Sequence, residues 1–276
     1  MRPGTLAPMP VLITGGGGRL ARELLPLLPG ASAPPRAELD VTDSAQVDAA
    51  VAALAARARG PLQSADGQQG GQGDDPIVVH AAAFTDVKRA EHERDGCWRV
   101  NVLGTRHVAE ACARHDALLV HISTDYVFAG DADTARAARG GYREDDPTGP
   151  TRNHYASTKL LAETEARSAP RHLVVRTSFR PREWPYPTGF TDVRTSQAYV
   201  DELAPELAEA VRLAPRIVAQ GVHTLHVAGE PTSVYELARR RKPDVRPASK
   251  AEAGVDLPDD VVLSTALWWR LKRELR

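Results

Sequence analysis

A chain of 276 residues with a formal net charge of −1 is long enough for one large α/β domain, or for a domain with a smaller lobe, and it lacks the basic field that would attract nucleic acid or an anionic membrane. Its two cysteines, Cys97 and Cys112, suggest neither a disulfide scaffold nor a zinc site, and we expect both to pack helices in a reducing cytoplasm. Prolines in residues 1–10 stand where a signal peptide needs an apolar core, so we expect none there, and the sequence has no apolar run of about eighteen residues. We therefore expect a cytoplasmic protein that acts on small molecules and binds no metal.

The first motif is a strand, a glycine turn and a helix. Residues 11–13 form a short apolar run, and leucines recur at helical spacing behind four consecutive glycines until residues 29–30. This order is typical of a dinucleotide site, in which Gly15 and Gly18 permit the tight turn and Ala21 lets the helix lie close to the strand. A glycine-rich hairpin is the alternative for this motif alone. The spacing Gly-x-x-Gly-x-x-Ala predicts cofactor contacts at Gly15, Gly17, Gly18, Arg19 and Leu20.

A second strand is expected within residues 31–43, at the edge of a doubly wound sheet where the adenosine of the cofactor lies. No acid follows this strand directly, but Arg36 is present, and an arginine at this edge pairs with a 2′-phosphate. We therefore expect NADPH as the cofactor, with NADH possible and a solvated Arg36 as the alternative. Asp40 and Val41 are candidates to border the adenine.

An alanine-rich helix is predicted over residues 44–59, followed by a Gly-, Gln- and Asp-rich segment at about 60–76. This low-complexity segment is typical of a mobile surface insertion. A buried strand resumes at residues 77–83 and ends in three small side chains that let a flat group approach the backbone. Close packing of strand and helix explains the same residues equally well: Ala81, Ala82 and Ala83.

Another helix is predicted over residues 98–115, and a strand over 118–122 leads into the string Ser-Thr-Asp-Tyr-Val-Phe at 123–128. Hydroxyl groups at the carboxyl end of a central strand lie where open α/β sheets bind ligands. A second polar insertion, which we expect to be mobile, follows at about residues 130–141.

The pair Tyr155 and Lys159 carries the chemistry. The two residues are four apart, so they share one face of a helix. A phenol with a pKa of about 10 is a poor acid-base group at neutral pH unless a cation stabilises its phenolate, and Lys159 is placed to do so. Tyr155 could then donate a proton to a carbonyl oxygen as hydride arrives, while Thr124 orients that oxygen and Lys159 holds the nicotinamide ribose. Alone, this spacing is usually a surface pair, but its order after the glycine turn and the Ser-Thr strand end is specific.

In these motifs the chain resembles the extended short-chain dehydrogenase/reductase family, and within it the dTDP-4-dehydrorhamnose reductases and their relatives. The resemblance covers nearly the whole chain and is carried by residues 14–21, 39–43, 81–87, 100–105, 123–128, 155–159 and 175–178. It implies an NAD(P)-dependent oxidoreductase of nucleotide-sugar metabolism with Thr124, Tyr155 and Lys159 as catalytic residues. It also implies that Asn101 bends its helix and supports a water relay.

The same resemblance implies that the sugar pocket is lined by Thr85, Val87, Asp125 and Tyr126. Two positions depart from the pattern, because Lys88 stands where these reductases commonly carry an aspartate and Phe179 where they often carry a tryptophan. The Pro-, Arg- and aromatic-rich residues 179–190 resemble a substrate-side loop. We expect Arg180 and Arg182 to meet a nucleotide diphosphate, with solvated arginines as the alternative.

The C-terminal part is predicted to contain a helix over residues 195–213, a strand over 223–228 and a capped helix over 232–240. Trp268 and Trp269 are expected to anchor the tail by packing. The whole chain is thus predicted to be α/β, with a Rossmann-type doubly wound parallel sheet in residues 1–178. Residues 179–276 would form a smaller substrate-binding lobe that could return one strand to the sheet.

Three functions remain open at this point. The first is an NAD(P)H-dependent reductase of a 4-keto nucleotide-sugar, with Tyr155 as the proton donor. The second is an epimerase or 4,6-dehydratase of the same superfamily, although the dehydratases place an Asp-Glu pair after the threonine and here Asp125 is followed by Tyr126. The third is a regulatory subunit that binds NADP without turnover, as in the methionine adenosyltransferase β subunit. A homodimer is a further possibility.

Overall fold

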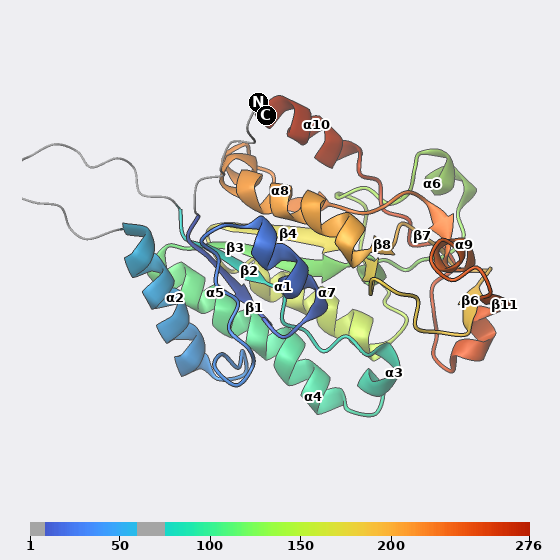
Figure 1. Cartoon of the computed structure of the whole chain (residues 1–276), viewed down its shortest axis with the longest axis horizontal. Coiled ribbons are helices and arrows are strands. Elements are labelled where there is room, and N and C mark those ends of the chain that lie inside the picture. The colour runs from blue at the N-terminus through green and yellow to red at the C-terminus, as the bar shows by residue number, and fades with distance from the viewer. Residues whose placement is uncertain (1–8, 60–74) are drawn as a thin grey trace, which may run out of the picture.

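A five-stranded parallel sheet lies at the centre of the structure, a computed structural model that describes residues 9–59 and 75–276 (Figure 1). In order across the sheet its strands are β1 (Val11–Thr14), β2 (Ile77–His80), β3 (Leu118–Thr124), β4 (His172–Thr177) and β9 (Thr224–His226). Every neighbouring pair runs parallel. The strands are almost wholly buried, as expected where helices cover both faces of a parallel sheet.

Helices form a layer on each face of the sheet, which confirms the predicted α/β fold (Figure 1). One layer consists of α1 (Arg19–Leu24), α8 (Val200–Ala219) and α10 (Ala266–Leu275). The other contains α2 (Ser44–Arg59), α5 (Gly104–His115) and α7 (His154–Ala166). Short elements are η1 (Leu25–Leu27), α3 (Val87–Ala90), η3 (Asp125–Val127), α6 (Thr134–Ala138) and η4 (Lys250–Ala253).

The predicted strand within residues 31–43 is wrong. Only Ser32 pairs with the sheet, donating its N–H to Val11 (2.9 Å) and accepting from Ile13 (2.8 Å). Pro34 and Pro35 follow and have no N–H to continue a ladder, so the chain turns instead. The adenosine edge predicted for this region is therefore made by turns.

The helix predicted over residues 98–115 is part of a longer one. It comprises α4 (Arg94–Trp98), a π-helical turn η2 (Arg99–Leu103) and α5. The irregularity expected at Asn101 is present, because this residue lies within the π-helical turn. Cys97 and Cys112 are buried in this helix, where they pack as predicted.

The C-terminal part adds pairs of short strands beside the main sheet (Figure 1). These pairs are β5 (Phe179–Arg180) with β8 (Ala198–Tyr199), β6 (Thr188–Phe190) with β11 (Arg246–Ala248), and β7 (Arg194–Thr195) with β10 (Thr232–Ser233). Because β7 and β8 use residues 194–199, the helix predicted from residue 195 starts only at Val200. The predicted capped helix is confirmed as α9 (Val234–Arg239), with a capping box between Ser233 and Glu236.

Most of the first predicted insertion lies outside the described residues, and the second contains α6, which Asp133 caps. No helix among residues 9–59 and 75–276 is long and apolar enough to cross a membrane.

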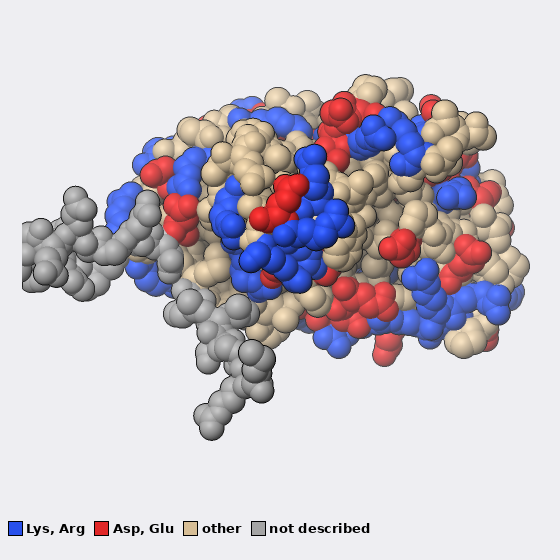
Figure 2. Space-filling view, turned by 90° about the horizontal axis from the view of Figure 1, so that it is seen from above, with Lys and Arg blue, Asp and Glu red and all other residues tan. Residues whose placement is uncertain are grey.

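Acidic and basic side chains are interspersed on the face turned to the viewer in Figure 2. On the α8 and α10 layer, Glu206 accepts from Lys272 (2.7 Å) and Glu209 from Arg276 (3.1 Å).

The packing role expected for two adjacent tryptophans is met by Trp268, which is 1% exposed and donates to Glu206 (2.9 Å), but not by Trp269, which is 43% exposed. We expect Trp268→Ala to lower the free energy of unfolding by about 3–5 kcal/mol, because it leaves a cavity under α8. Trp269→Ala is the matched control, with an expected change below about 1 kcal/mol. Urea denaturation followed by circular dichroism measures both, and equal losses would contradict this packing assignment.

Candidate active site

A cleft of about 920 Å³ runs along the carboxyl ends of β1 to β4. This edge is where open α/β sheets bind ligands. Apart from Arg182, the residues predicted to be catalytic or to contact cofactor or substrate line this one cleft: Gly15, Gly17, Gly18, Arg19, Leu20, Arg36, Asp40, Val41, Ala81, Ala82, Ala83, Thr85, Val87, Thr124, Asp125, Tyr126, Tyr155, Lys159 and Arg180. Segments far apart in the sequence thus meet at one edge of the sheet.

The glycine turn forms one end of the cleft. Gly15 has φ +73°, and a Cβ there would lie 2.8 Å from the Cα of Ala82, so the loops after β1 and β2 touch through their backbones. The N–H of Gly18 closes the turn on the carbonyl of Gly15 (2.7 Å). A Cβ on Gly17 would meet nothing within 4 Å, so this position opens into the cleft.

The region beyond the turn carries charge. Arg36 is exposed and pairs with Asp40 at 3.0 Å, and both residues line the cleft. Asp40 also accepts from the N–H of Thr42 (2.9 Å). Partial burial acts to raise the pKa of Asp40. The hydrogen bonds from Thr42 and the Arg36 guanidinium outweigh this effect and hold the pKa below its ordinary value.

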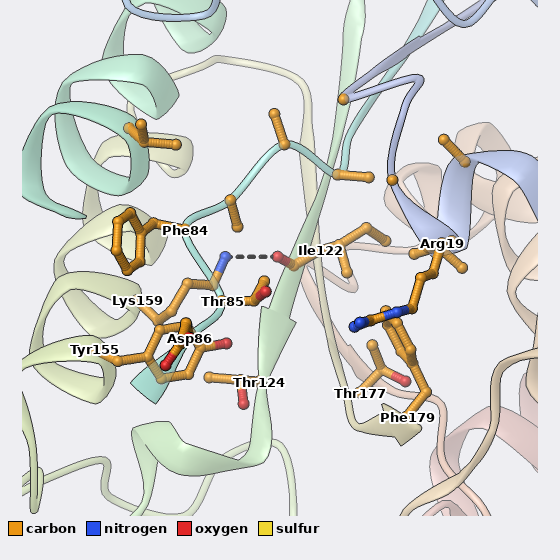
Figure 3. A pocket seen from close by; sticks show the side chains of 18 of the residues that line it. Arg19, Phe84, Thr85, Asp86, Ile122, Thr124, Tyr155, Lys159, Thr177 and Phe179 are labelled. Carbon is orange, nitrogen blue, oxygen red and sulfur yellow. Dashed lines mark hydrogen bonds between the residues drawn. The ribbon is translucent and has the colours of Figure 1, made fainter. Parts of the chain in front are cut away.

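Thr124, Tyr155 and Lys159 converge at the end of β3 (Figure 3). Thr124 ends the strand, while Tyr155 and Lys159 lie on successive turns of α7, whose first turn is capped by Asn153. The ammonium of Lys159 donates to the carbonyl oxygen of Ile122 (2.8 Å), which fixes α7 against β3 (Figure 3).

Burial controls the protonation of this group. It raises the pKa of Tyr155, an effect that the neighbouring Thr124 hydroxyl opposes, so the phenol holds its proton at neutral pH. It lowers the pKa of Lys159 to about 8, while the Glu163 carboxylate acts in the opposite direction. The arrangement therefore presents a protonated phenol beside a lysine that titrates just above neutrality.

Asp125 and Tyr126 extend the site beyond Thr124. Asp125 is fully buried and accepts a hydrogen bond from the Thr124 hydroxyl (2.9 Å), and burial raises the pKa of Asp125 to about 6. Its second oxygen, Oδ2, has no hydrogen-bond partner within the described part of the chain. The ring of Tyr126 lies edge-on to that of Tyr155, with centroids 6.3 Å apart, and burial raises its pKa to about 12.

Two arginines of the loop at residues 179–190 have different positions. Arg180 lines the cleft, where its Nε donates to Gln197 (2.7 Å) and its guanidinium lies 5.3 Å from the ring centroid of Trp184. Arg182 does not line the cleft, so the expectation that it meets the substrate is wrong. It forms a bidentate pair with Glu23 of α1 (2.7 Å for each bond), which ties the loop to the glycine helix.

Several lining residues were not singled out by the sequence: Arg22, Phe84, Asp86, Arg89, Ile122, Thr177, Ser178, Pro185, Tyr186 and Gln197. Thr177 ends β4 as Thr124 ends β3, and Ser178 comes directly after it, so the strand-end rule could have found both residues. Gln197 carries no local signal, because it reaches the cleft through its place beside β8.

Comparison with known proteins agrees with this geometry. Residues 9–180 match the family described as RmlD substrate binding domain. The chain belongs to the RmlD substrate binding domain family. This confirms the resemblance carried by the sequence motifs.

Curated proteins with sequence similarity to this chain carry related names. A dTDP-4-dehydrorhamnose reductase of Streptomyces griseus is 40% identical over 158 residues, which are 55% of this chain and 43% of the relative. A probable dTDP-4,6-dihydroxy-2-methyloxan-3-one 4-ketoreductase of Streptomyces antibioticus is 35% identical over 228 residues, 77% of this chain and 67% of the relative. The first curated relatives are thus matched over less than half of their length.

A crystal structure of dTDP-4-dehydrorhamnose reductase from Bacillus anthracis in complex with NADP has the same fold, with a TM-score of 0.73 at 23% identity. The similarity covers 96% of this chain and 97% of that one. The similarity in fold therefore extends over both the sheet and the C-terminal part.

The glycine turn gives a test of backbone strain. Gly15→Ala places a Cβ at positive φ against the backbone of Ala82, and we expect the free energy of unfolding to fall by about 2 kcal/mol or more. Gly17→Ala, in open space, should change it by less than about 0.5 kcal/mol. Denaturant titration of the two variants measures the difference, and an unaffected Gly15→Ala protein would show that the turn is not strained.

Proposed function

We propose that the chain is an NAD(P)H-dependent reductase of a 4-keto nucleotide-sugar, of the dTDP-4-dehydrorhamnose reductase type. The observation that carries this proposal is the convergence of Thr124, Tyr155 and Lys159 in a cleft that continues to the glycine turn. The names of the relatives from two Streptomyces species and the NADP complex of the Bacillus anthracis protein support it.

The cleft fits a dinucleotide. Gly17 opens into it, and residues 81–83 line it beside the turn with small side chains, so a pyrophosphate can approach the backbone closely. Arg36, Asp40 and Val41 would border the adenosine, with Arg36 available to a 2′-phosphate. Tyr155 and Lys159 lie at the other end, where they would hold the nicotinamide ribose.

The reduced nicotinamide would supply a hydride to the keto carbon. Tyr155 donates its proton to the keto oxygen: burial keeps the phenol protonated before this step, but the raised pKa also makes it a weaker acid, so the transfer depends on stabilisation of the phenolate. Thr124 orients that oxygen, and the positive charge of Lys159 stabilises the phenolate left on Tyr155 until it regains a proton from solvent.

The sugar nucleotide would occupy the remaining part of the cleft, lined by Thr85, Val87, Asp125, Tyr126 and Arg180. No carboxylate among residues 9–59 and 75–276 forms an ion pair with Arg180, whose Nε is held by Gln197. An anionic group of the substrate, such as its diphosphate, can therefore pair with this guanidinium.

Two further features complete the proposal. A homodimer is supported by Trp98 and Leu161, which are 40% and 41% exposed on the neighbouring helices α4 and α7, and sedimentation velocity would test it. A cytoplasmic location is the setting expected from the composition of the chain.

Tyr155→Phe removes the proposed proton donor. We expect the kcat for NADPH oxidation with dTDP-4-dehydrorhamnose to fall by about 10²- to 10⁴-fold, while NADPH binding changes by less than about threefold. Tyr235→Phe, which lies outside the cleft, should retain full activity. Steady-state kinetics and fluorescence titration of NADPH supply both measurements. NADPH binding without turnover on any 4-keto nucleotide-sugar would contradict the reductase and favour a regulatory subunit.

Arg36 should set the preference between cofactors. Removal of a charge-assisted pair with a 2′-phosphate predicts that Arg36→Ala raises the KM for NADPH about tenfold and leaves the KM for NADH unchanged. Arg57→Ala, an exposed arginine of α2 outside the cleft, serves as the control. If both cofactors are affected alike, Arg36 does not contact the 2′-phosphate.

A further inference from the structure

A buried ion pair lies directly behind the cleft and plays no part in the chemistry described so far. Glu163 of α7 is 0% exposed, and Arg176 of β4 is 3% exposed. Arg176 donates to both carboxylate oxygens of Glu163, each at 2.9 Å, and Ser123 and Arg167 add bonds of 2.7 and 2.9 Å. A buried pair of this kind is weak evidence for stability, because desolvation of both charges opposes their attraction.

The position of Glu163 connects it to the catalytic residues. Lys159 and Glu163 are four apart on α7, so they lie on one face of the helix. Lys159 binds the carbonyl of Ile122, and Glu163 binds the hydroxyl of Ser123. Successive turns of α7 thus hold successive residues of β3, and the next residue of that strand is Thr124.

The partner of Glu163 continues this arrangement on β4. Arg176 is in register with Ser123, and Thr177, which lines the cleft, is in register with Thr124. The ion pair therefore connects α7, β3 and β4 at the level just beneath the three converging residues. A change at Glu163 would act on the ends of both strands.

Charge is the second link between Glu163 and the site. Burial raises the pKa of Glu163, but the bonds from Arg176 and Ser123 outweigh it and keep this pKa below its ordinary value, so the group is a carboxylate. The other titratable or charged groups around Lys159 and Glu163 are His80 from β2, Cys97 from α4, His121 from β3, Arg167 at the C-cap of α7, Arg176 from β4 and His226 from β9. Burial lowers the pKa of the three histidines well below neutrality, so these rings are neutral. Glu163 is the carboxylate that favours the charged form of Lys159.

We propose that Glu163 is a positioning residue of the active site, which keeps Lys159 charged and, through Ser123 and Arg176, holds the strand ends that present Thr124. This inference rests on the proposed function, because it assigns Glu163 a role only where Lys159 supports Tyr155. Glu163 itself does not line the cleft and touches neither substrate nor cofactor.

The charge of Lys159 can be measured without substrate or cofactor. The chain contains five lysines, Lys88, Lys159, Lys242, Lys250 and Lys272, so ¹³Cε-lysine labelling gives a simple NMR spectrum that can be titrated with pH. In the wild-type chain we expect Lys159 to titrate near pH 8. Glu163→Gln removes an anion that favours the charged form of Lys159, so the midpoint of the Lys159 titration should fall by about one pH unit.

Two variants control this measurement. Glu163→Asp keeps the charge and should restore the midpoint to nearly its wild-type value. Glu165→Gln removes a carboxylate of the same helix that pairs with Arg106 at the surface (2.8 Å), and it should leave the midpoint unchanged. A simple loss of packing at Glu163 would not produce this pattern.

The same variants predict a kinetic signature. If charged Lys159 supports Tyr155, the activity of Glu163→Gln with NADPH and a 4-keto nucleotide-sugar should decline on the alkaline side at a pH about one unit lower than in the wild type. The KM for the sugar nucleotide should change by less than about threefold. Glu163→Asp should move the alkaline limb back.

Glu163→Gln leaves Arg176 buried without its counter-charge, which can impair folding. The double variant Glu163→Gln/Arg176→Gln removes both charges and allows the same lysine titration in a chain with no unpaired buried ion. A folded variant of either kind whose Lys159 titrates as in the wild type overturns the proposal. A wild-type chain without turnover, together with a shifted Lys159 in Glu163→Gln, contradicts the proposed function and leaves the electrostatic link between the two residues standing.

Discussion

The parallel pairing of β3 with β4 is the constraint on which the site depends. Both strands are buried, so a charged residue on either must find a partner inside the protein. Arg176 of β4 finds it in Glu163, which requires α7 to lie across these two strands in one register. With α7 held there, Tyr155 and Lys159 project to the end of β3 beside Thr124. The positions of Tyr155 and Lys159 therefore depend on the ion pair that the buried guanidinium of Arg176 forms with Glu163.

A second polar side chain fixes the opposite wall of the cleft. Asn101 accepts from the N–H of Phe84 (2.7 Å) and donates to its carbonyl (3.2 Å), so the loop after β2 is bound as though by a neighbouring strand. Its amide also donates to Thr158 of α7 (3.0 Å). Since these contacts satisfy a 1% exposed amide, they hold the loop and α7 at a fixed separation.

The sequence predicts the elements whose signal is local. Short apolar runs mark β1, β2 and β3, and the glycine turn and the Tyr155 to Lys159 spacing are enough to locate two walls of the cleft. Non-local pairing is what the pattern misses. Arg180 and Arg182 lie in one loop with similar surroundings in the sequence, yet the first faces the cleft and the second pairs with Glu23, about 160 residues away in the chain. No periodicity within residues 179–190 encodes that difference.

The two halves of the cleft are built to different degrees of rigidity. The residues proposed for proton transfer stand on a continuous buried sheet and on a thirteen-residue helix. Arg180 and Gln197, on the proposed substrate side, depend on the two-residue strands β5 and β8 and on the loop tied down by Arg182. Substitutions in such short ladders disturb few backbone bonds, so the proposed substrate recognition can change while the proposed proton transfer is kept. The family match covers residues 9–180 and so includes Arg180 but not Gln197.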